Sequence, residues 1–416
     1  MNLKQSPFAP ERFPDLPAIA GVRAATASRG FYAARGLKRD DVFLFAFDEG
    51  TTSAGVFTQS TTASADVQWC RDALKAGRGE ARALVVNSGN SNAFTGPKGV
   101  LKNDATLAAM TAALGVPKEQ CFLAATGVIG EPLDDPNYVG SAVPDMSARL
   151  SIPNWEACAK AFMTTDTYPK GASESCEIEG VSVKLAGIAK GSGMIAPNMA
   201  TMLAYVFTDA AIAPTLLDDL LREAVTVSFN AITVDSDTST SDTLMVFASG
   251  ASGAPMIEDR DDPRLDAFAA SLTKICRDLA FQVVKDGEGA TKFISISVEG
   301  AQSDHSAKIM AADVANSPLV KTALAAGDAN WGRVVMALGK SGEPIDLDRL
   351  SIWFGEIQVA EQGGRAAAYD DDLANAVCAE PEINIRVSVG AGSGGASIYT
   401  CDLTHAYIDI NGAYRT

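Results

Sequence analysis

The segment from Lys190 to Leu203 places a threonine where self-activated nucleophilic chemistry needs one. It reads Lys-Gly-Ser-Gly-Met-Ile-Ala-Pro-Asn-Met-Ala-Thr-Met-Leu, and a predicted strand over 202–208 begins directly after Ala200-Thr201. A threonine hydroxyl is a weak nucleophile until a base accepts its proton. Breaking the Ala200–Thr201 bond would give Thr201 an α-amine with a pKa of about 7.7–8.0, suited to that role. From the spacing alone, a structural turn is an equally good interpretation.

Few other residues could act as the base for such chemistry. The chain has 2 histidines, His305 and His405. A catalytic triad also needs a nucleophile and an orienting acid, and no sequence pattern identifies either for these histidines. We therefore favour surface or core-edge positions for both. The 7 cysteines are scattered without a CxxC pair, which predicts buried, small apolar side chains.

Two further motifs resemble ligand sites without meeting their physical requirements. Gly390-x-Gly392-x-x-Gly395 follows a strand, but a predicted strand rather than a helix N-terminus comes next, so we expect a hairpin turn. Asp235-x-Asp237 lacks the glycine and the bidentate glutamate of a calcium loop. We interpret 235–243 as a polar turn or a loop beside the substrate, and we expect no metal.

Composition excludes several classes of function. The 416 residues include 34 Lys+Arg and 51 Asp+Glu, a net charge of −17 that disfavours nucleic-acid binding. A zinc site built on several imidazoles is excluded by the count of histidines. No apolar run is long enough to span a membrane, and the N-terminus lacks an apolar signal segment, so we expect a cytoplasmic protein. A transit peptide using Arg23, Arg29 and Arg35 is the alternative.

Hydrophobic periodicity predicts a mixture of strands and helices that must position these residues. The expected strands cover 42–48, 82–87, 121–125, 177–188, 202–208, 244–249, 292–299 and 382–389. The expected helices cover 65–76, 104–114, 154–163, 215–227, 264–282 and 317–325. Several strands follow one another without an intervening helix, so we predict an α+β fold with layered sheets.

Motifs in order along nearly the whole chain resemble the ornithine acetyltransferase family, the glutamate N-acetyltransferases of arginine biosynthesis. The self-cleavage region of that family is similar to Lys190–Leu203. The other matching segments are Ala54-Gly-Val-Phe-Thr58, Asn87-Ser-Gly-Asn-Ser-Asn92, Thr126-Gly-Val-Ile-Gly130, Thr164-Thr-Asp-Thr167, Asp286-Gly-Glu-Gly-Ala-Thr291, Gly327-Asp-Ala-Asn-Trp-Gly332, Thr400-Cys-Asp-Leu403 and Tyr414-Arg-Thr416.

The resemblance implies a role for particular residues. Thr201 matches the nucleophile, Ala200-Thr201 the cleavage site, and Thr126 and Gly127 the oxyanion hole. The matched substrate-binding positions are Thr164, Lys190, Thr201, Glu288, Asn411 and Thr416. Lys190 suits a substrate carboxylate and Glu288 an ammonium, although each would otherwise be interpreted as a solvated surface charge.

The same resemblance implies a ping-pong reaction without a bound cofactor. An acetyl-Thr201 intermediate would carry the acetyl group of N-acetylornithine to glutamate, giving ornithine and N-acetylglutamate. Whether acetyl-CoA is a second donor stays open. Self-cleavage would give an α chain (1–200) and a β chain (201–416), which are expected to form one intertwined unit and a heterotetramer.

Two rival functions remain open at this point. An N-terminal-nucleophile amidohydrolase or aminopeptidase would use the same threonine with water as acceptor, and a small-molecule-binding protein would leave the segment uncleaved. The sequence departs from the family pattern at Phe94, Ser241 and Ala413, none of which is a matched catalytic position.

Overall fold

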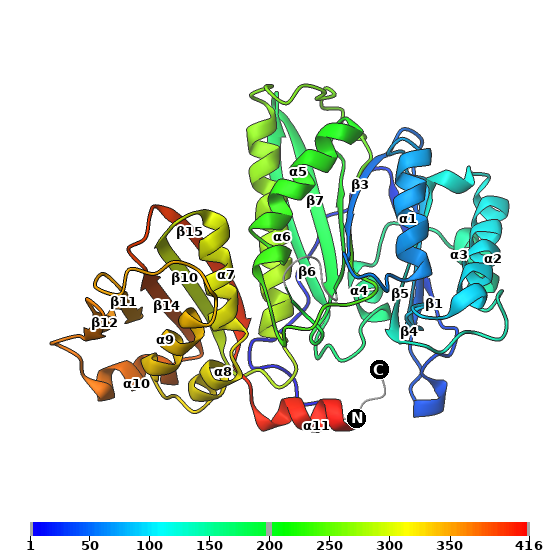
Figure 1. Ribbon diagram of the computed structural model, residues 1–416. Coiled ribbons are helices and arrows are strands. Elements are labelled where there is room, and N and C mark those ends of the chain that lie inside the picture. Colours follow the sequence, from blue (N-terminus) through cyan, green and yellow to red (C-terminus); the bar gives the residue numbers. More distant parts are fainter. Residues whose placement is uncertain (1–2, 197–201, 414–416) are drawn as a thin grey trace.

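Four strands from the first part of the chain form one sheet (Figure 1). The structure is a computed structural model that describes residues 3–196 and 202–413. In spatial order the strands of this sheet are β1 (Val22–Ala27), β2 (Val42–Phe47), β4 (Ala83–Asn90) and β5 (Cys121–Val128). Because β4 and β5 run parallel, their carboxyl ends meet at the same edge of the sheet.

A five-stranded sheet combines strands from both sides of the predicted cleavage site. Its order is β3 (Thr52–Phe57), β9 (Thr243–Ala248), β8 (Leu203–Thr208), β7 (Val181–Lys190) and β6 (Lys170–Ile178). The last residue of β7, Lys190, lies opposite the first residue of β8, Leu203, which lies opposite Thr243 of β9. The end of β7 and the starts of β8 and β9 therefore meet in one row.

The two sheets face each other across an aromatic core. Phe45 stacks on Phe207 and Phe47 on Phe247, each pair with ring centroids 4.4 Å apart. Helices cover the outer faces: α5 (Pro214–Thr226) and α6 (Leu265–Lys285) pack on the five-stranded sheet, and α2 (Gly96–Leu114) and α3 (Val143–Ala148) pack on the other. Helix α1 (Ala65–Ala76) packs beside the edge strands β5 and β3, and α4 (Trp155–Ala161) extends the aromatic core. This layering confirms the predicted α+β class.

A six-stranded sheet forms a separate lobe in the C-terminal part. Its order is β13 (Gly364–Arg365), β12 (Ile357–Glu361), β11 (Ser351–Phe354), β14 (Glu382–Ser388), β10 (Phe293–Ala301) and β15 (Gly394–Cys401). The helices packed with it are α7 (Asp304–Ala315), α8 (Pro318–Ala325), α9 (Trp331–Gly339) and α10 (Asp371–Ala379). The lobe has its own apolar core.

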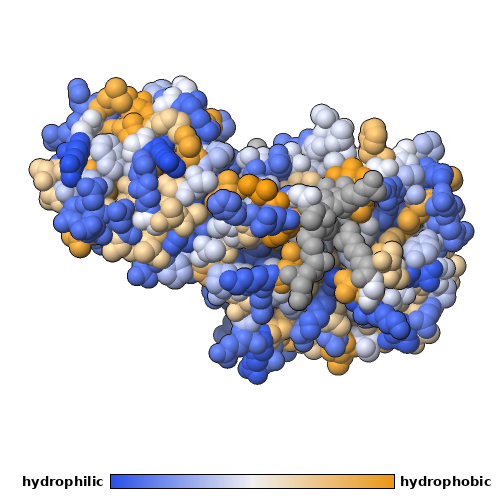
Figure 2. All heavy atoms as spheres, turned by 90° about the horizontal axis from the view of Figure 1, so that it is seen from below, coloured by the Kyte–Doolittle hydropathy of each residue, from blue (hydrophilic) through white to orange (hydrophobic). Residues whose placement is uncertain are grey.

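We call the two facing sheets and the helices packed on them the main body. Helix α11 (His405–Ala413) follows the C-terminal lobe and lies across the lower end of the main body (Figure 1). Gly289 lets it approach closely, since a Cβ on Gly289 would lie 2.8 Å from the Ala406 Cβ. Figure 2 views the molecule from this end and shows hydrophilic residues over most of the face. Among the helices of residues 3–196 and 202–413, none combines the length and apolar character needed to cross a bilayer.

Most predicted elements form for the expected local reasons. Helix α1 begins after Ser64, whose hydroxyl accepts the Val67 N–H at 3.3 Å as an N-cap. The apolar face predicted for 264–282 is buried in α6. The single strand predicted over 177–188 is wrong, because Glu179 and Gly180, with φ of 51° and 78°, form a turn between β6 and β7.

The glycine motif at 390–395 is a crossover rather than a hairpin. Strand β10 lies between β14 and β15, so the segment passes over its end, where the Ala391 and Gly392 N–H groups donate to the Gly300 carbonyl at 2.7 Å. The predicted hairpin is therefore wrong. A strand does follow the motif, which confirms that it lacks the helix N-terminus of a dinucleotide site.

The cysteine and histidine predictions are confirmed. Six cysteines are buried, Cys176 is half-buried, and all are free thiols. Burial raises the pKa of thiols such as Cys276, to about 12, which leaves them unreactive. His305 and His405 are both exposed.

Candidate active site

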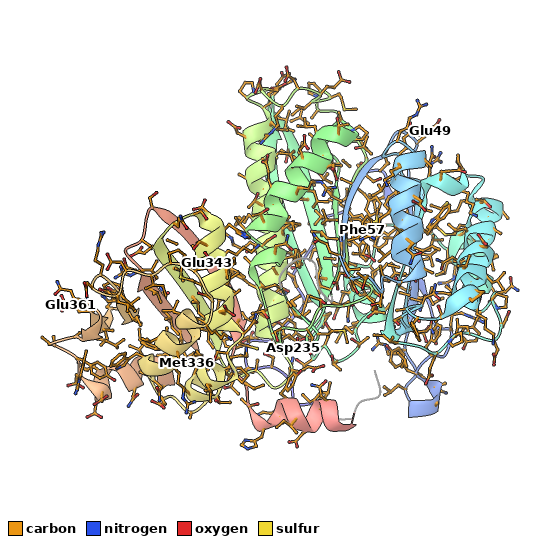
Figure 3. All side chains as sticks on the ribbon, viewed as in Figure 1. Glu49, Phe57, Asp235, Met336, Glu343 and Glu361 are labelled. Atoms are coloured by element: carbon orange, nitrogen blue, oxygen red, sulfur yellow. The ribbon has the colours of Figure 1, made fainter. Side chains whose placement is uncertain are left out.

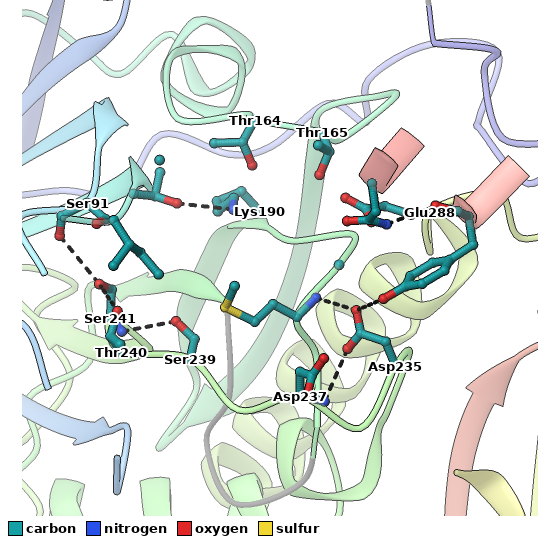
Figure 4. A pocket seen from close by; sticks show the side chains of 17 residues that line it. Ser91, Thr164, Thr165, Lys190, Asp235, Asp237, Ser239, Thr240, Ser241 and Glu288 are labelled. Carbon is teal, nitrogen blue, oxygen red and sulfur yellow. Dashed lines mark hydrogen bonds between the residues drawn. The ribbon is translucent and has the colours of Figure 1, made fainter. Parts of the chain in front are cut away.

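A cavity of about 130 Å³ opens where the two body sheets meet α11. The sequence-predicted residues Thr126, Gly127, Thr164, Lys190, Glu288 and Asn411 all line it (Figure 4). Asp235, another lining residue, lies at the α11 end of the body (Figure 3). Segments distant in sequence are thus brought together as expected. Ala200, Thr201 and Thr416 lie outside the described residues.

The oxyanion-hole candidates sit near the end of β5. Gly127 has φ of 129°, and a Cβ there would lie 2.5 Å from the Gly89 carbonyl carbon on the neighbouring strand. Only glycine allows this approach of β4 and β5. The Thr126 hydroxyl oxygen accepts a hydrogen bond from the Lys190 ammonium at 3.2 Å. That bond uses a lone pair of the hydroxyl, so its proton is available to a substrate oxygen.

Lys190 is buried at the end of β7, and 4% of it is exposed. Burial lowers its pKa below that of an ordinary lysine, and the carboxylate of Asp166 opposes this effect. Because Lys190 pairs in register with Leu203, its backbone lies beside the start of the strand that follows the Ala200-Thr201 segment.

Glu288 faces the cavity from the loop after α6. Its carboxylate accepts a hydrogen bond from the Asn411 amide of α11 at 2.6 Å, and its backbone N–H donates to the Ser192 carbonyl at 2.8 Å. A Cβ on Gly193 would lie 2.5 Å from the Glu288 carboxyl carbon, so this glycine makes room for the carboxylate. Glu288 is 8% exposed, which makes its charge available mainly to a ligand in the cavity.

A buried ionic triad supports both Thr164 and Lys190. The Lys170 ammonium contacts Asp166 at 2.7 Å and Asp286 at 2.6 Å, and all three side chains are 0% exposed. Asp166 also accepts the N–H groups of Thr164 at 2.9 Å and Gly191 at 2.7 Å. The triad therefore ties the backbone of two predicted substrate-binding segments to the end of α6.

The protonation of the triad is set by competing effects. Burial would raise the pKa of Asp166, but the charges of Lys170 and Lys190 and the Gly191 N–H outweigh it, so that pKa is lowered. Burial raises the pKa of Asp286. Burial would lower the pKa of Lys170, but both carboxylates outweigh it and raise that pKa. The ammonium stays charged.

Asp235 anchors the loop that leads towards the predicted cleavage site. Its carboxylate accepts the N–H groups of Met194 at 2.6 Å and Ile195 at 2.9 Å and the Tyr407 hydroxyl at 3.3 Å (Figure 4). Burial raises its pKa. Residues of the 235–243 loop line the cavity. The Asp235 carboxylate accepts hydrogen bonds from backbone N–H groups.

On the other side of the predicted cleavage site, Asp242 accepts the Met202 N–H at 2.8 Å, and burial raises the pKa of Asp242 well above the usual range. Asp235 and Asp242 thus anchor the described backbone on both sides of residues 197–201.

Of the three departures from the family pattern, Ser241 lines the cavity. Phe94 is 82% exposed and is not a lining residue. Ala413 is the last residue of α11.

Sequence reasoning missed Lys170, Asp286, Asp242 and Tyr407. The signal for Asp286 was its position in the Asp286–Thr291 motif, and Asp166 lies within the Thr164–Thr167 motif. Lys170 is separated from Asp286 by 116 positions, so nothing local pairs them.

Comparison with known proteins agrees with the family resemblance. Residues 27–416 match the ArgJ family. The arginine biosynthesis bifunctional protein ArgJ of Rhizobium meliloti is 54% identical over 100% of both chains, and that of Agrobacterium fabrum is 52% identical over 100% of both. The crystal structure of the arginine biosynthesis bifunctional protein ArgJ from Bacillus halodurans is 38% identical with a TM-score of 0.50, covering 51% of this chain and 100% of that chain. The chain therefore belongs to the ArgJ family.

Proposed function

We propose that the chain is a cytoplasmic acetyltransferase of arginine biosynthesis that moves the acetyl group of N-acetylornithine to glutamate through an ester on Thr201. The observation that carries this proposal is the convergence of Thr126, Lys190 and Glu288 on one cavity beside the start of β8. A cation and an anion held in the same cavity suit a substrate with both a carboxylate and an ammonium.

Maturation comes first in this proposal. The Thr201 hydroxyl attacks the Ala200 carbonyl, the peptide bond becomes an ester as the nitrogen takes a proton, and water hydrolyses the ester. The products are an Ala200 carboxylate and a free Thr201 α-amine. The Bacillus halodurans chain, matched in full by 51% of this chain, has the length expected of one cleavage product.

Acetyl transfer then uses the new amine as base. The Thr201 oxygen attacks the acetyl carbonyl of N-acetylornithine, the amine passes the proton to the departing nitrogen, and ornithine leaves. The α-amine of glutamate attacks the resulting ester, and the proton returns to the Thr201 oxygen as N-acetylglutamate forms.

Each cavity residue has a physical task in these steps. The Thr126 hydroxyl and the Gly127 N–H stabilise the oxyanion of each tetrahedral intermediate. The Lys190 ammonium pairs with a substrate carboxylate and polarises the Thr126 hydroxyl, from which it lies 3.2 Å. Glu288, oriented by Asn411, pairs with a substrate ammonium. Thr164 and Thr416 complete the proposed substrate contacts.

Maturation is tested by comparing Thr201→Ala with Thr201→Ser. The parent and the serine variant should yield two fragments of about half the chain each, the larger starting at residue 201, because both keep a hydroxyl. The alanine variant should stay intact. Intact parent protein, or cleavage of the alanine variant, would contradict the proposal.

Transfer is tested with labelled N-acetylornithine. The mass of one acetyl group should appear on the 201–416 fragment and should be discharged by added glutamate. A hydrolase of the same class would discharge the label equally fast without glutamate, so acceptor dependence separates the two functions.

Acetyl-CoA as a second donor and a heterotetramer of two α and two β chains belong to the same proposal. Incubation of the enzyme with acetyl-CoA and glutamate, with N-acetylglutamate as the readout, tests the first. The native mass in solution tests the second, with four chains expected.

A further inference from the structure

A groove of about 960 Å³ runs along the outer edge of β3, outside the cavity described above. We propose that it binds an extended acidic peptide, which adds to β3 as a further antiparallel strand. The floor of the groove is residues 53–57, and its walls are α1 and α5. Figure 1 shows β3 between these helices, and Figure 3 places Phe57 there.

Strand β3 is an edge strand whose outward backbone groups can be identified from its register. The Thr58 N–H donates to the Asp242 carbonyl at 3.0 Å, so even-numbered residues point their backbone groups towards β9. The Ser53 N–H donates in the opposite direction, to the Gly79 carbonyl at 2.6 Å. By alternation, the N–H and C=O groups of Gly55 and Phe57 point into the groove.

The chain itself shows that this edge accepts an antiparallel strand. Glu80 forms an antiparallel bridge with Thr52, and the Ala81 N–H donates to the Thr51 carbonyl at 2.9 Å. This pairing covers the first half of β3. Across residues 3–196 and 202–413, no backbone partner continues it over Gly55 and Phe57. An incoming peptide would complete these bonds.

The α1 wall selects for acidic side chains. Lys75 in the last turn of α1 and Arg78 just after the helix are exposed, and within the described part of the chain neither forms an ion pair. These two unpaired cations contrast with the net charge of −17. On the opposite wall Arg222 is paired with Asp218 at 2.8 Å, and the exposed Asp219 makes that wall acidic rather than basic. Peptide residues that face α1 should therefore be Asp or Glu.

Gly55 allows close packing on the α1 side of the floor. A Cβ at this position would lie 3.1 Å from Leu74 of α1 and 2.7 Å from the Phe57 ring, so these two side chains fill the space beside the glycine.

A single peptide fits this groove better than a second copy of the chain. Two copies paired through β3 about a twofold axis perpendicular to the sheet would bring their cationic α1 walls together. The edge also lies between α1 and α5, and all six residues of β3 are buried, which hinders the approach of a second folded copy. The remaining alternative is that the cations only guard a bare edge against pairing.

The test uses the purified, full-length protein and the pentapeptide Glu-Val-Glu-Val-Glu-amide with fluorescein on its N-terminal amine. Control peptides replace Glu with Lys or carry N-methyl groups on the backbone. Fluorescence anisotropy reports binding, and hydrogen–deuterium exchange reports protection of β3. The variant is Lys75→Glu with Arg78→Glu, and its matched control is Lys4→Glu with Lys38→Glu, which makes the same charge change at exposed positions elsewhere.

We expect saturable binding of the acidic peptide, slower amide exchange at Gly55 and Phe57, and about tenfold weaker binding in the Lys75/Arg78 variant only. The N-methylated and lysine peptides should bind poorly. The proposal is overturned if the lysine peptide binds equally well, if Gly55 and Phe57 gain no protection, or if both charge variants bind alike. Protection that rises with protein concentration alone, together with a doubled native mass, would identify a second copy as the occupant and also overturn it.

Discussion

Replacing Lys170 with methionine removes the ammonium that both Asp166 and Asp286 contact, and keeps a side chain of similar length. The contacts of 2.7 and 2.6 Å are fully buried, so water cannot take over the role of the ammonium. Removing one partner of a buried ion pair costs about 3–5 kcal/mol of folding free energy. We expect a loss in that range for Lys170→Met.

The loss should depend on pH in a definite direction. Without the ammonium, a buried carboxyl of the pair has a folded pKa above its unfolded value of about 3.9. Such a group binds a proton more readily in the folded state, so its penalty is small at low pH and grows as pH rises through the folded pKa. The stability deficit of the variant should therefore be larger near about pH 8 than near about pH 5.

Urea unfolding in a Thr201→Ala background, in which one uncleaved chain unfolds, measures the effect. The matched control is Lys160→Met, which removes an exposed ion pair with Glu156 of 2.6 Å, where 58% and 46% of the side chains are exposed. That change should cost about 0–1 kcal/mol. If Lys170→Met costs no more than Lys160→Met, or if its deficit shrinks as pH rises, the reasoning about the triad is refuted.

Three further predictions concern the cavity. Burial lowers the pKa of Lys190, so the KM for glutamate should rise at a pH below the ordinary lysine pKa of about 10.4. Lys190→Arg should flatten that rise, because arginine stays charged. Identical pH profiles of the parent and the variant would contradict this prediction. Gly127→Ala should lower kcat by about 10²–10³. Gly130→Ala also places alanine at a positive φ, 80°, but has no atom within 4 Å of its Cβ, and it should stay active. Gly193→Ala should displace the Glu288 carboxylate, 2.5 Å from the new Cβ, and raise KM more than it lowers kcat, as steady-state kinetics can show.

Elements governed by local sequence were predictable. Helix 65–76 matches α1 at both ends because Ser64 caps it and Gly77 follows it. The apolar stripe of 264–282 is the buried face of α6. Helix α2 begins at Gly96, earlier than predicted, because the Gly-Pro start carries no apolar periodicity.

Features that depend on distant partners were not predictable. A hairpin at 390–395 is the simplest local solution, but β10 inserts between the two strands from about a hundred positions away. The six matched cavity residues were identified through motif resemblance, and their convergence depends on sheet register. From the sequence, Lys170 cannot be told from a surface lysine. Its partners Asp166 and Asp286 become apparent only when β6 is placed beside the end of α6.

The order of strands in the five-stranded sheet has a consequence for biogenesis. Strand β8 lies between β7 and β9, and the bond proposed to break belongs to the connection from β7 to β8. These strands must already be paired before the cavity at their ends exists. Neither half can assemble this sheet alone, since β3, β6 and β7 come from one half and β8 and β9 from the other. Under this proposal only a chain that has folded is cleaved. The ratio of cut to uncut chain in a cell would report, on a simple gel, how many molecules had reached the native state.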